Sequence, residues 1–173
     1  MSKTSTFFVR FFRILCFLII LWFLVYFFFG ERFSIYFTDR VFASYFPEIL
    51  VFLTAASIYG LFILAIKSSY KKWQNILLFI GGFLFALTPF LAYHGYFQYQ
   101  CDFWNQEIKE EKTIYFNSQN KFETVKVIQS VCGTDNSEIK LDTVFSKQFT
   151  PYFEMQNPVK IQKVENADWT VVK

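Results

Sequence analysis

The chain has 173 residues, of which 54% are hydrophobic and 18% charged, with a formal net charge of +3. Phenylalanine fills 26 positions, and 20 of these lie within residues 1–97. A soluble domain of average composition carries about 25% charged residues. This composition excludes a simple globular protein, a disordered chain and a collagen-like fibre, and it predicts one part suited to lipid and another suited to water.

Three long runs in the first part carry no charge, at residues 14–30, 49–66 and 76–97. About 20 apolar residues cross a hydrocarbon core, and the backbone there must satisfy its own hydrogen bonds as a helix. We therefore predict a membrane domain over residues 1–97, with transmembrane helices near 11–30, 46–66 and 75–97 and the lipid bilayer as its partner. The first run is too long for a signal peptide and lacks small residues after it, so we interpret it as an uncleaved anchor.

The basic residues indicate the orientation of these helices. Two clusters would lie on one side of the membrane, namely Lys3, Arg10 and Arg13, and Lys67, Lys71 and Lys72. The connection between the first two runs carries only Arg32 and Arg40, together with acidic residues. The positive-inside rule then predicts a cytoplasmic N-terminus and an extracytoplasmic segment 98–173. The expected location is a bacterial inner membrane with a periplasmic domain, although a eukaryotic secretory membrane would suit the same topology.

The three cysteines fall into two groups. Cys16 lies within the first run, where a small apolar role is the simplest and palmitoylation is the alternative. Cys101 and Cys132 both fall in the segment assigned to the outside, so we predict a disulfide that closes a loop of about thirty residues. Metal binding is the rival interpretation, but it needs three or four clustered ligands. We therefore predict no metal site.

Residues 98–173 change to the patterns of a β domain. Alternating polarity and turn residues predict short strands at 113–116, 122–131, 139–145, 159–164 and 169–172. On the second of these, Val125, Val127 and Val131 would share one face, while residues 102–112 form either an amphipathic helix or a polar linker. The fold class is thus a membrane α domain followed by a small extracytoplasmic antiparallel β sandwich or roll.

The sequence contains no catalytic constellation that we can recognise. There is no nucleophile motif with a nearby base, no phosphate-binding loop and no basic patch for nucleic acid. We predict that the chain is not an enzyme, has no cofactor and does not bind nucleic acid. His94 is the one candidate functional polar residue, and the alternative is an interfacial residue among tyrosines.

Two pairs of small residues indicate close helix packing. They are Ala56 with Gly60 and Gly82 with Ala86, each separated by three residues. They favour packing of the second helix on the third within one chain, or contact with another subunit in a homo-oligomer. We predict a non-enzymatic membrane protein, an accessory, assembly or immunity-type subunit that recognises a protein partner through its outer β domain. The alternative is a small transporter or channel component whose helices oligomerise.

Overall fold

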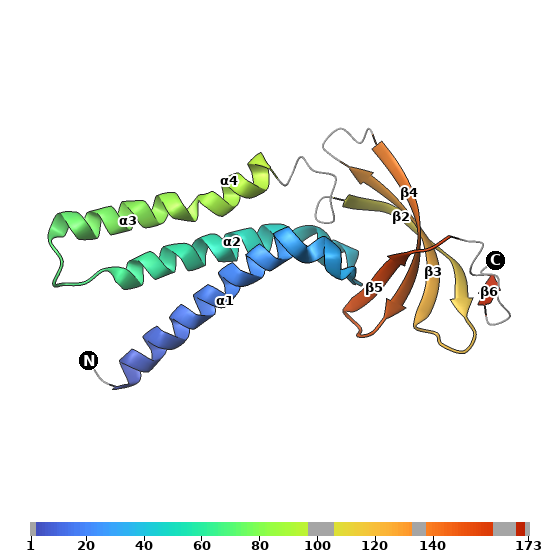
Figure 1. The fold of residues 1–173 in the computed structure, drawn as a ribbon, viewed down its shortest axis with the longest axis horizontal. Coiled ribbons are helices and arrows are strands. Elements are labelled where there is room, and N and C mark those ends of the chain that lie inside the picture. Colours follow the sequence, from blue (N-terminus) through green and yellow to red (C-terminus); the bar gives the residue numbers. More distant parts are fainter. Residues whose placement is uncertain (1–2, 97–105, 133–137, 161–168, 172–173) are drawn as a thin grey trace. The chain divides into compact units, whose positions relative to one another are not determined.

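The computed structural model describes residues 3–96, 106–132, 138–160 and 169–171. The chain divides into two compact units. The helical unit comprises Met1–Phe29 and Phe46–Phe97, and the sheet unit comprises Gly30–Tyr45 and Gln98–Lys173. Figure 1 labels the four helices and the strands β2 to β6. The connection between the first two helices thus belongs with the C-terminal segment.

The helices are α1 (Lys3–Phe33), α2 (Arg40–Ala65), α3 (Lys72–Ala86) and α4 (Thr88–Gly95). They supply three helical segments that are long and apolar enough to cross a membrane, at Thr6–Gly30, Arg40–Ala65 and Lys72–Gly95. Only a minority of the side chains in each span is buried within the chain. The prediction of three apolar helices of membrane-spanning length is therefore confirmed.

The third span is divided into α3 and α4 by Pro89, which lies in the first turn of α4. Proline has no amide hydrogen, so it cannot donate to the carbonyl four residues earlier, that of Phe85. The hydroxyl of Thr88 donates to this carbonyl at 2.7 Å instead. The helix break thus leaves the Phe85 carbonyl satisfied, as a lipid environment requires.

The helical unit is packed through close contacts between aromatic rings and small residues. A Cβ atom added at Gly82 would lie 2.5 Å from Cβ of Phe62, so α3 approaches α2 at this glycine. The Phe62 ring also stacks on Phe85 with a centroid distance of 5.6 Å. On the other side of α2, a Cβ atom at Gly60 would lie 3.2 Å from the ring of Phe12 in α1.

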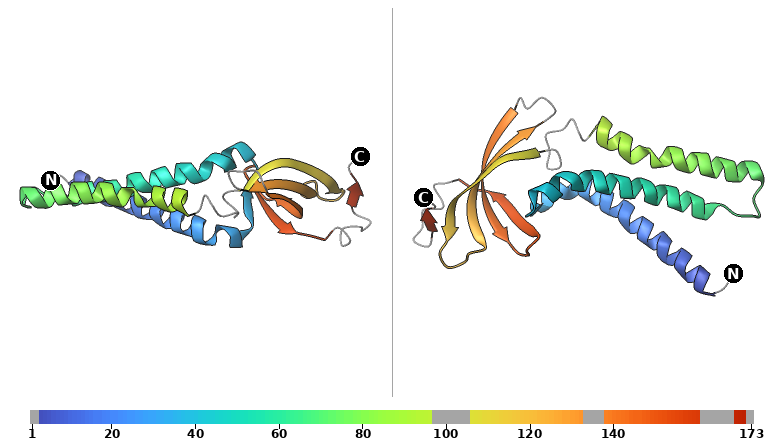
Figure 2. Two further views of the ribbon diagram at one scale, coloured as in Figure 1. Left: turned by 90° about the horizontal axis from the view of Figure 1, so that it is seen from above. Right: turned by 180° about the vertical axis from the view of Figure 1, so that it is seen from behind.

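The strands form a single six-stranded sheet, whose twist is visible from two further directions in Figure 2. They are β1 (Ile35–Phe37), β2 (Gln106–Asn117), β3 (Glu123–Cys132), β4 (Glu138–Gln148), β5 (Phe153–Pro158) and β6 (Trp169–Val171). Their order is β1-β5-β4-β3-β2-β6, and every neighbouring pair is antiparallel. The predicted antiparallel sheet is confirmed in this form.

Three parts of the sheet differ from the strands expected from the sequence. Strand β1 comes from the connection between α1 and α2, which carried no strand prediction. Strand β2 begins at Gln106, within the stretch expected to be a helix or a linker. Strand β5 was missed, and residues 159–160 of the expected strand 159–164 lie outside any strand, while 161–164 fall outside the described residues.

Strand β5 has a burial pattern that reverses the usual one. Its polar residues Glu154 and Gln156 are buried, whereas Met155 between them is exposed. An alternation of buried apolar and exposed polar residues is the usual signal of a half-buried strand. This strand could not be found by that signal, because its inward-facing side chains belong to a polar network.

Candidate functional site

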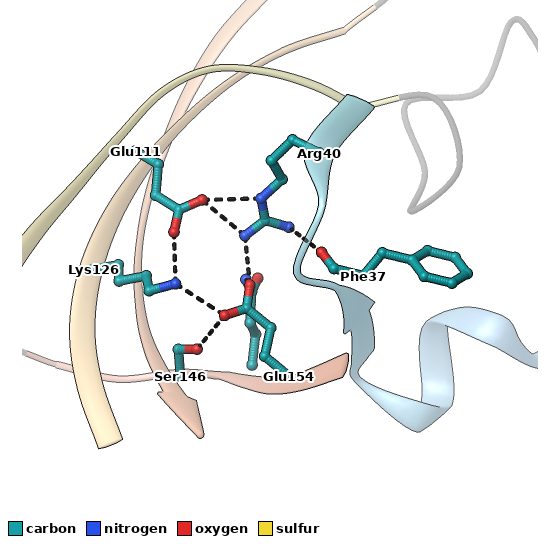
Figure 3. A network of polar contacts seen from close by, with 7 residues as sticks. Phe37, Arg40, Glu111, Lys126, Ser146 and Glu154 are labelled. Carbon is teal, nitrogen blue, oxygen red and sulfur yellow. Dashed lines mark hydrogen bonds and ion pairs between the residues drawn. The ribbon is translucent and has the colours of Figure 1, made fainter. Parts of the chain in front are cut away.

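Four charged side chains of the sheet unit form a closed network, shown in Figure 3. Nη2 of Arg40 lies 2.8 Å from Oε2 of Glu111 and 2.6 Å from Oε1 of Glu154. Nζ of Lys126 lies 2.6 Å from Oε1 of Glu111 and 2.9 Å from Oε2 of Glu154. Each cation thus contacts both carboxylates, and the formal charges of the four groups cancel. We call these four residues the charge network.

The network draws on parts of the chain that are distant in sequence. Arg40 is the first residue of α2, whereas Glu111, Lys126 and Glu154 lie on β2, β3 and β5. Strand β4 contributes Ser146, whose hydroxyl donates to Oε2 of Glu154 at 2.7 Å. The network therefore connects the start of an apolar helix of membrane-spanning length to four strands of the sheet.

Glu154 is the buried centre of the network, with a relative exposure of 2%. Besides the two cations, Ser146 and the amide of Gln156 donate to its carboxylate, the latter at 2.6 Å. Burial by itself raises the pKa of Glu154, but the hydrogen bonds from Lys126 and Ser146 and the positive charges of Lys126 and Arg40 outweigh it. The pKa therefore lies below its ordinary value, and Glu154 is ionised at neutral pH.

The chemistry of this arrangement favours a structural role. A general base needs a carboxylate that can accept a proton from substrate near the operating pH. The carboxylate of Glu154 is instead occupied by four donors and has a lowered pKa. A fully satisfied network of this kind fixes the positions of the elements that contribute to it.

Backbone hydrogen bonds hold the same connection against β5. Strand β1 pairs with β5 in the register Ile35 with Met155 and Phe37 with Phe153. The amide of Thr38 donates to the carbonyl of Tyr152 at 2.9 Å. Residues 34–38 are therefore an integral edge of the sheet.

The start of α2 directly after this edge is fixed by a side-chain cap. Oδ1 of Asp39 accepts hydrogen bonds from the amides of Val41 at 2.9 Å and Phe42 at 3.1 Å. These are two of the first helical amides, which have no partner within the helix. Asp39 thus caps the apolar helix α2 at the residue directly before Arg40.

An aromatic cluster lies beside this cap in the sheet unit. The ring of Phe37 contacts Phe42 at a centroid distance of 5.1 Å and Phe153 at 5.2 Å. Phe153 in turn stacks on Phe149 at 6.2 Å. We call Phe37, Phe42, Phe149, Tyr152 and Phe153 the aromatic cluster. Four of its members line an open groove of 630 Å³ together with Thr38, Asp39 and Pro151.

His94, the candidate functional residue of the sequence, lies in α4. It lines an open hollow of 510 Å³ in the helical unit. Glu48 and Phe52 of α2 line the same hollow. Its ring meets that of Tyr93 edge-on at 5.0 Å. The alternatives of a functional residue and an interfacial residue both remain compatible with this position.

The residues of the two small-residue pairs have different surroundings. Gly82 lies against Phe62, and Ala86 is buried, on α3. Gly60 faces α1 and Ala56 is exposed, so the pair on α2 does not meet the pair on α3.

The predicted disulfide stays a prediction. Cys101 lies outside the described residues, and the same holds for the side chain of Cys132, the last residue of β3. Cys16 is free and buried in α1. Among the described residues, no group of three or more histidine, cysteine or acidic side chains is placed to hold a metal ion.

Comparisons of the chain with protein-family models, curated proteins and solved structures find no match.

The charge network and the aromatic cluster were both missed by sequence reasoning. Arg40 was counted only as a charge for membrane orientation, and Glu154 stands between a phenylalanine and a methionine in an unassigned stretch. The one available signal was the sequence T-D-R-V-F at 38–42, because aspartate before a helical run is typical of an N-cap.

Proposed function

We propose that this chain is a non-catalytic, accessory, assembly or immunity-type subunit of a membrane that recognises a protein partner through its sheet unit. The observation that supports this role is a pair of exposed aliphatic side chains on β4. Ile139 and Leu141 are 62% and 67% exposed. Because they are two residues apart on one strand, they point to the same side of the sheet.

The position of β4 in the sheet defines how such a partner would bind. Strand β4 is paired with β3 on one side and β5 on the other. The pairs with β5 are at residues 144–148, so Ile139 and Leu141 lie beyond the part of β4 that β5 covers and are held by pairing with Val131 and Gln129 of β3. We propose that the partner contacts the exposed side chains of Ile139 and Leu141, as in an ordinary protein interface with an apolar centre.

The charge network also supports binding over catalysis. It is the one large cluster of ionisable groups that the described residues bring together, and its charges compensate one another. An active site usually contains groups whose pKa values are moved toward the operating pH. The pKa of Glu154 is instead lowered, which moves it away from the operating pH.

The pairing of β1 with β5 supports the proposed membrane topology. Two paired strands must lie on the same side of a membrane, and the second and third spans separate β1 from β5 in the chain. Two crossings return the chain to the same side, as the proposal requires. The positive-inside rule then favours a cytoplasmic N-terminus and an extracytoplasmic sheet unit, in a bacterial inner membrane. The disulfide and closure into a sandwich or roll belong to the same proposal.

The orientation is tested by labelling a cysteine introduced at Lys147, in a background where the native cysteines are replaced. Lys147 lies on β4 and its side chain is half exposed. A membrane-impermeant thiol reagent added to intact cells or spheroplasts should label it. Labelling that requires opening of the cytoplasm would contradict the orientation.

The partner is tested by photo-crosslinking in the membrane of origin. A photoreactive p-benzoylphenylalanine at Leu141 should give a protein adduct of defined size. The same residue at Lys140 is the matched control, because its side chain is 57% exposed on the opposite face of β4. The adduct should disappear when Ile139→Lys is added to the labelled chain. Equal adducts at positions 140 and 141, or none at 141, would contradict the proposal.

One observation favours the alternative of a transporter or channel component that oligomerises through its helices. Ala56 is exposed on α2, and a Cβ atom at Gly81 of α3 would meet no atom within 4 Å. Such open small residues allow the helices of a second copy to approach closely. Sedimentation of the detergent-solubilised chain distinguishes the two roles: a homo-oligomer lost on Ala56→Leu supports the alternative, whereas a monomer contradicts it.

A further inference from the structure

We propose that the aromatic cluster lies in the interface of the lipid bilayer and seats the β1 edge of the sheet on the membrane surface. The cluster consists of Phe37, Phe42, Phe149, Tyr152 and Phe153, as defined above. This inference does not depend on the proposed protein partner, because it concerns different residues and a different ligand. It assigns a function to the groove of 630 Å³ and to the turn that borders it.

Strand β1 is attached at both ends to helices of membrane-spanning length. Helix α1 ends at Phe33, and β1 begins two residues later at Ile35. Strand β1 ends at Phe37, and α2 begins three residues later at Arg40. A three-residue strand between two such helix ends has little chain with which to leave the membrane surface.

The aromatic cluster includes a residue of α2 that lies close to the apolar run of this helix. Phe42 belongs to the same uninterrupted helix as Phe46. Four residues of an α-helix rise by about 6 Å. Phe42, whose ring contacts Phe37, is therefore only about one helical turn from the start of the predicted hydrocarbon-spanning run.

The turn between β4 and β5 is held close to β1, and therefore close to the start of α2. Strand β5 is hydrogen-bonded to β1, which sets it about 4.8 Å away in the plane of the sheet. The amide of Thr38 donates to the carbonyl of Tyr152, the last residue of the turn. Arg40 and Glu154 hold the same two segments together through their side chains at 2.6 Å. The turn is therefore fixed to the residues that enter the membrane.

The exposed side chains of this turn are of types that are favourable at a lipid interface. Tyr152 is 74% exposed and Phe149 is exposed beside Pro151. Large aromatic side chains with a polar tip are enriched at the level of the lipid headgroups, where the ring is in an apolar layer and the hydroxyl stays hydrated. In bulk water these rings would form an apolar patch, whereas the interface accepts them.

The order of the strands supplies a matched control. Strand β6 lies at the opposite edge of the sheet from β1. Five strand spacings separate the two edges, a distance of about 24 Å. Val171 on β6 is 56% exposed, so it resembles Tyr152 in accessibility and apolar character but lies far from the β1 edge. If the sheet stands on the membrane surface by its β1 edge, this distance keeps Val171 out of the lipid interface.

The experiment uses the full chain in phosphatidylcholine vesicles. A photoreactive p-benzoylphenylalanine replaces Tyr152 in one variant and Val171 in the other, and the irradiated protein is weighed by mass spectrometry. We expect an added mass of one phosphatidylcholine molecule at position 152, several-fold more abundant than at position 171. Both sites are exposed, so both variants should retain the circular dichroism spectrum of the unsubstituted chain.

Two results would overturn the inference. One is an absence of lipid adduct at position 152 in a chain that retains its spectrum, and the other is an equal yield at positions 152 and 171. In native membranes, a protein adduct in place of the lipid adduct at 152 would likewise overturn it and would identify a protein as the occupant. A protein adduct at 141 with no lipid adduct at 152 would leave the proposed function intact.

Discussion

Nη2 of Arg40 and Oε1 of Glu154 lie 2.6 Å apart although 114 residues separate them in the sequence. Arg40 is the first residue of an apolar helix of membrane-spanning length, and Glu154 is the second residue of a strand near the other end of the chain. The contact lies wholly within the sheet unit. It makes the connection between α1 and α2 a structural part of the sheet.

Replacing Arg40 should destabilise the sheet unit. In Arg40→Gln, the buried carboxylate of Glu154 loses one of its two cations and a hydrogen bond of 2.6 Å. Because the Arg40 side chain is 25% exposed, water compensates in part, and we expect a loss of about 2–3 kcal/mol. Hydrogen exchange of the β5 amides measures this change. The control is Lys140→Gln, which breaks an exposed pair of 3.4 Å with Asp142 and should cost about 0–1 kcal/mol.

The stability of the sheet unit should fall on acidification. The pKa of Glu154 is lower in the folded chain than its ordinary value of 4.5. Its contribution is therefore fully present above 4.5 and is lost as the pH falls through the lower, folded value. Denaturant unfolding of the chain in detergent at a series of pH values measures this loss.

The variant Glu154→Gln isolates this contribution. It should be less stable at neutral pH and should lose less stability between neutral pH and the acidic range. Some acid sensitivity should remain, because the hydrogen bond from Lys147 lowers the pKa of Glu123 as well. An identical pH dependence in the variant and the original chain would contradict the role of Glu154.

Gly82→Ala should loosen the contact between α3 and α2. The added methyl group would lie 2.5 Å from Cβ of Phe62, so the helices or the ring must shift. Overpacking of this kind costs about 1–3 kcal/mol. The matched control is Gly81→Ala, where nothing lies within 4 Å and the better helix propensity of alanine applies. Thermal unfolding in detergent should rank Gly81→Ala at or above the original chain and Gly82→Ala below it.

Asp39→Ala should weaken the start of α2. It removes the acceptor for the amides of Val41 and Phe42, which costs about 1 kcal/mol for a typical N-cap. Asp39→Asn retains an oxygen acceptor and should lose much less. Hydrogen exchange at residues 41–43 measures the difference. An equal effect of both variants would show that the charge of Asp39, and not its hydrogen bonds, matters there.

The membrane helices could be predicted from the sequence because their signal is local. An uncharged run of about 20 residues meets the length of the hydrocarbon core without reference to the rest of the chain. Strand β3 was likewise found from its alternation, and Val125 and Val131 are buried as expected, whereas Val127 is only half-buried. Ile128 and Ser130, on the other side of the strand, are buried as well, which alternation on a single strand does not reveal.

The charge network could not be predicted because each member resembles a surface charge on its own. Glu154 is flanked by Phe153 and Met155, and a local pattern would place the apolar neighbours inside and the acid outside. The opposite arrangement is stabilised by Arg40 and Lys126, which are distant in sequence. Strand β1 could not be predicted for a related reason. Its three residues form a strand only because β5, which is distant in sequence, supplies the hydrogen bonds.

The position of β1 in the chain has a consequence for biosynthesis. Ile35 pairs with Met155, so 155 − 35 = 120 residues must follow before its partner is made, about 6–24 s at typical rates of synthesis. The second and third spans are synthesised in that interval. In the proposed membrane topology, failure of the third span to insert would leave the later strands on the other side of the membrane from β1 and Arg40. Completion of the sheet is then restricted to chains whose helices have inserted correctly, and faulty chains keep an unpaired β5 edge that is open to aggregation and proteolysis.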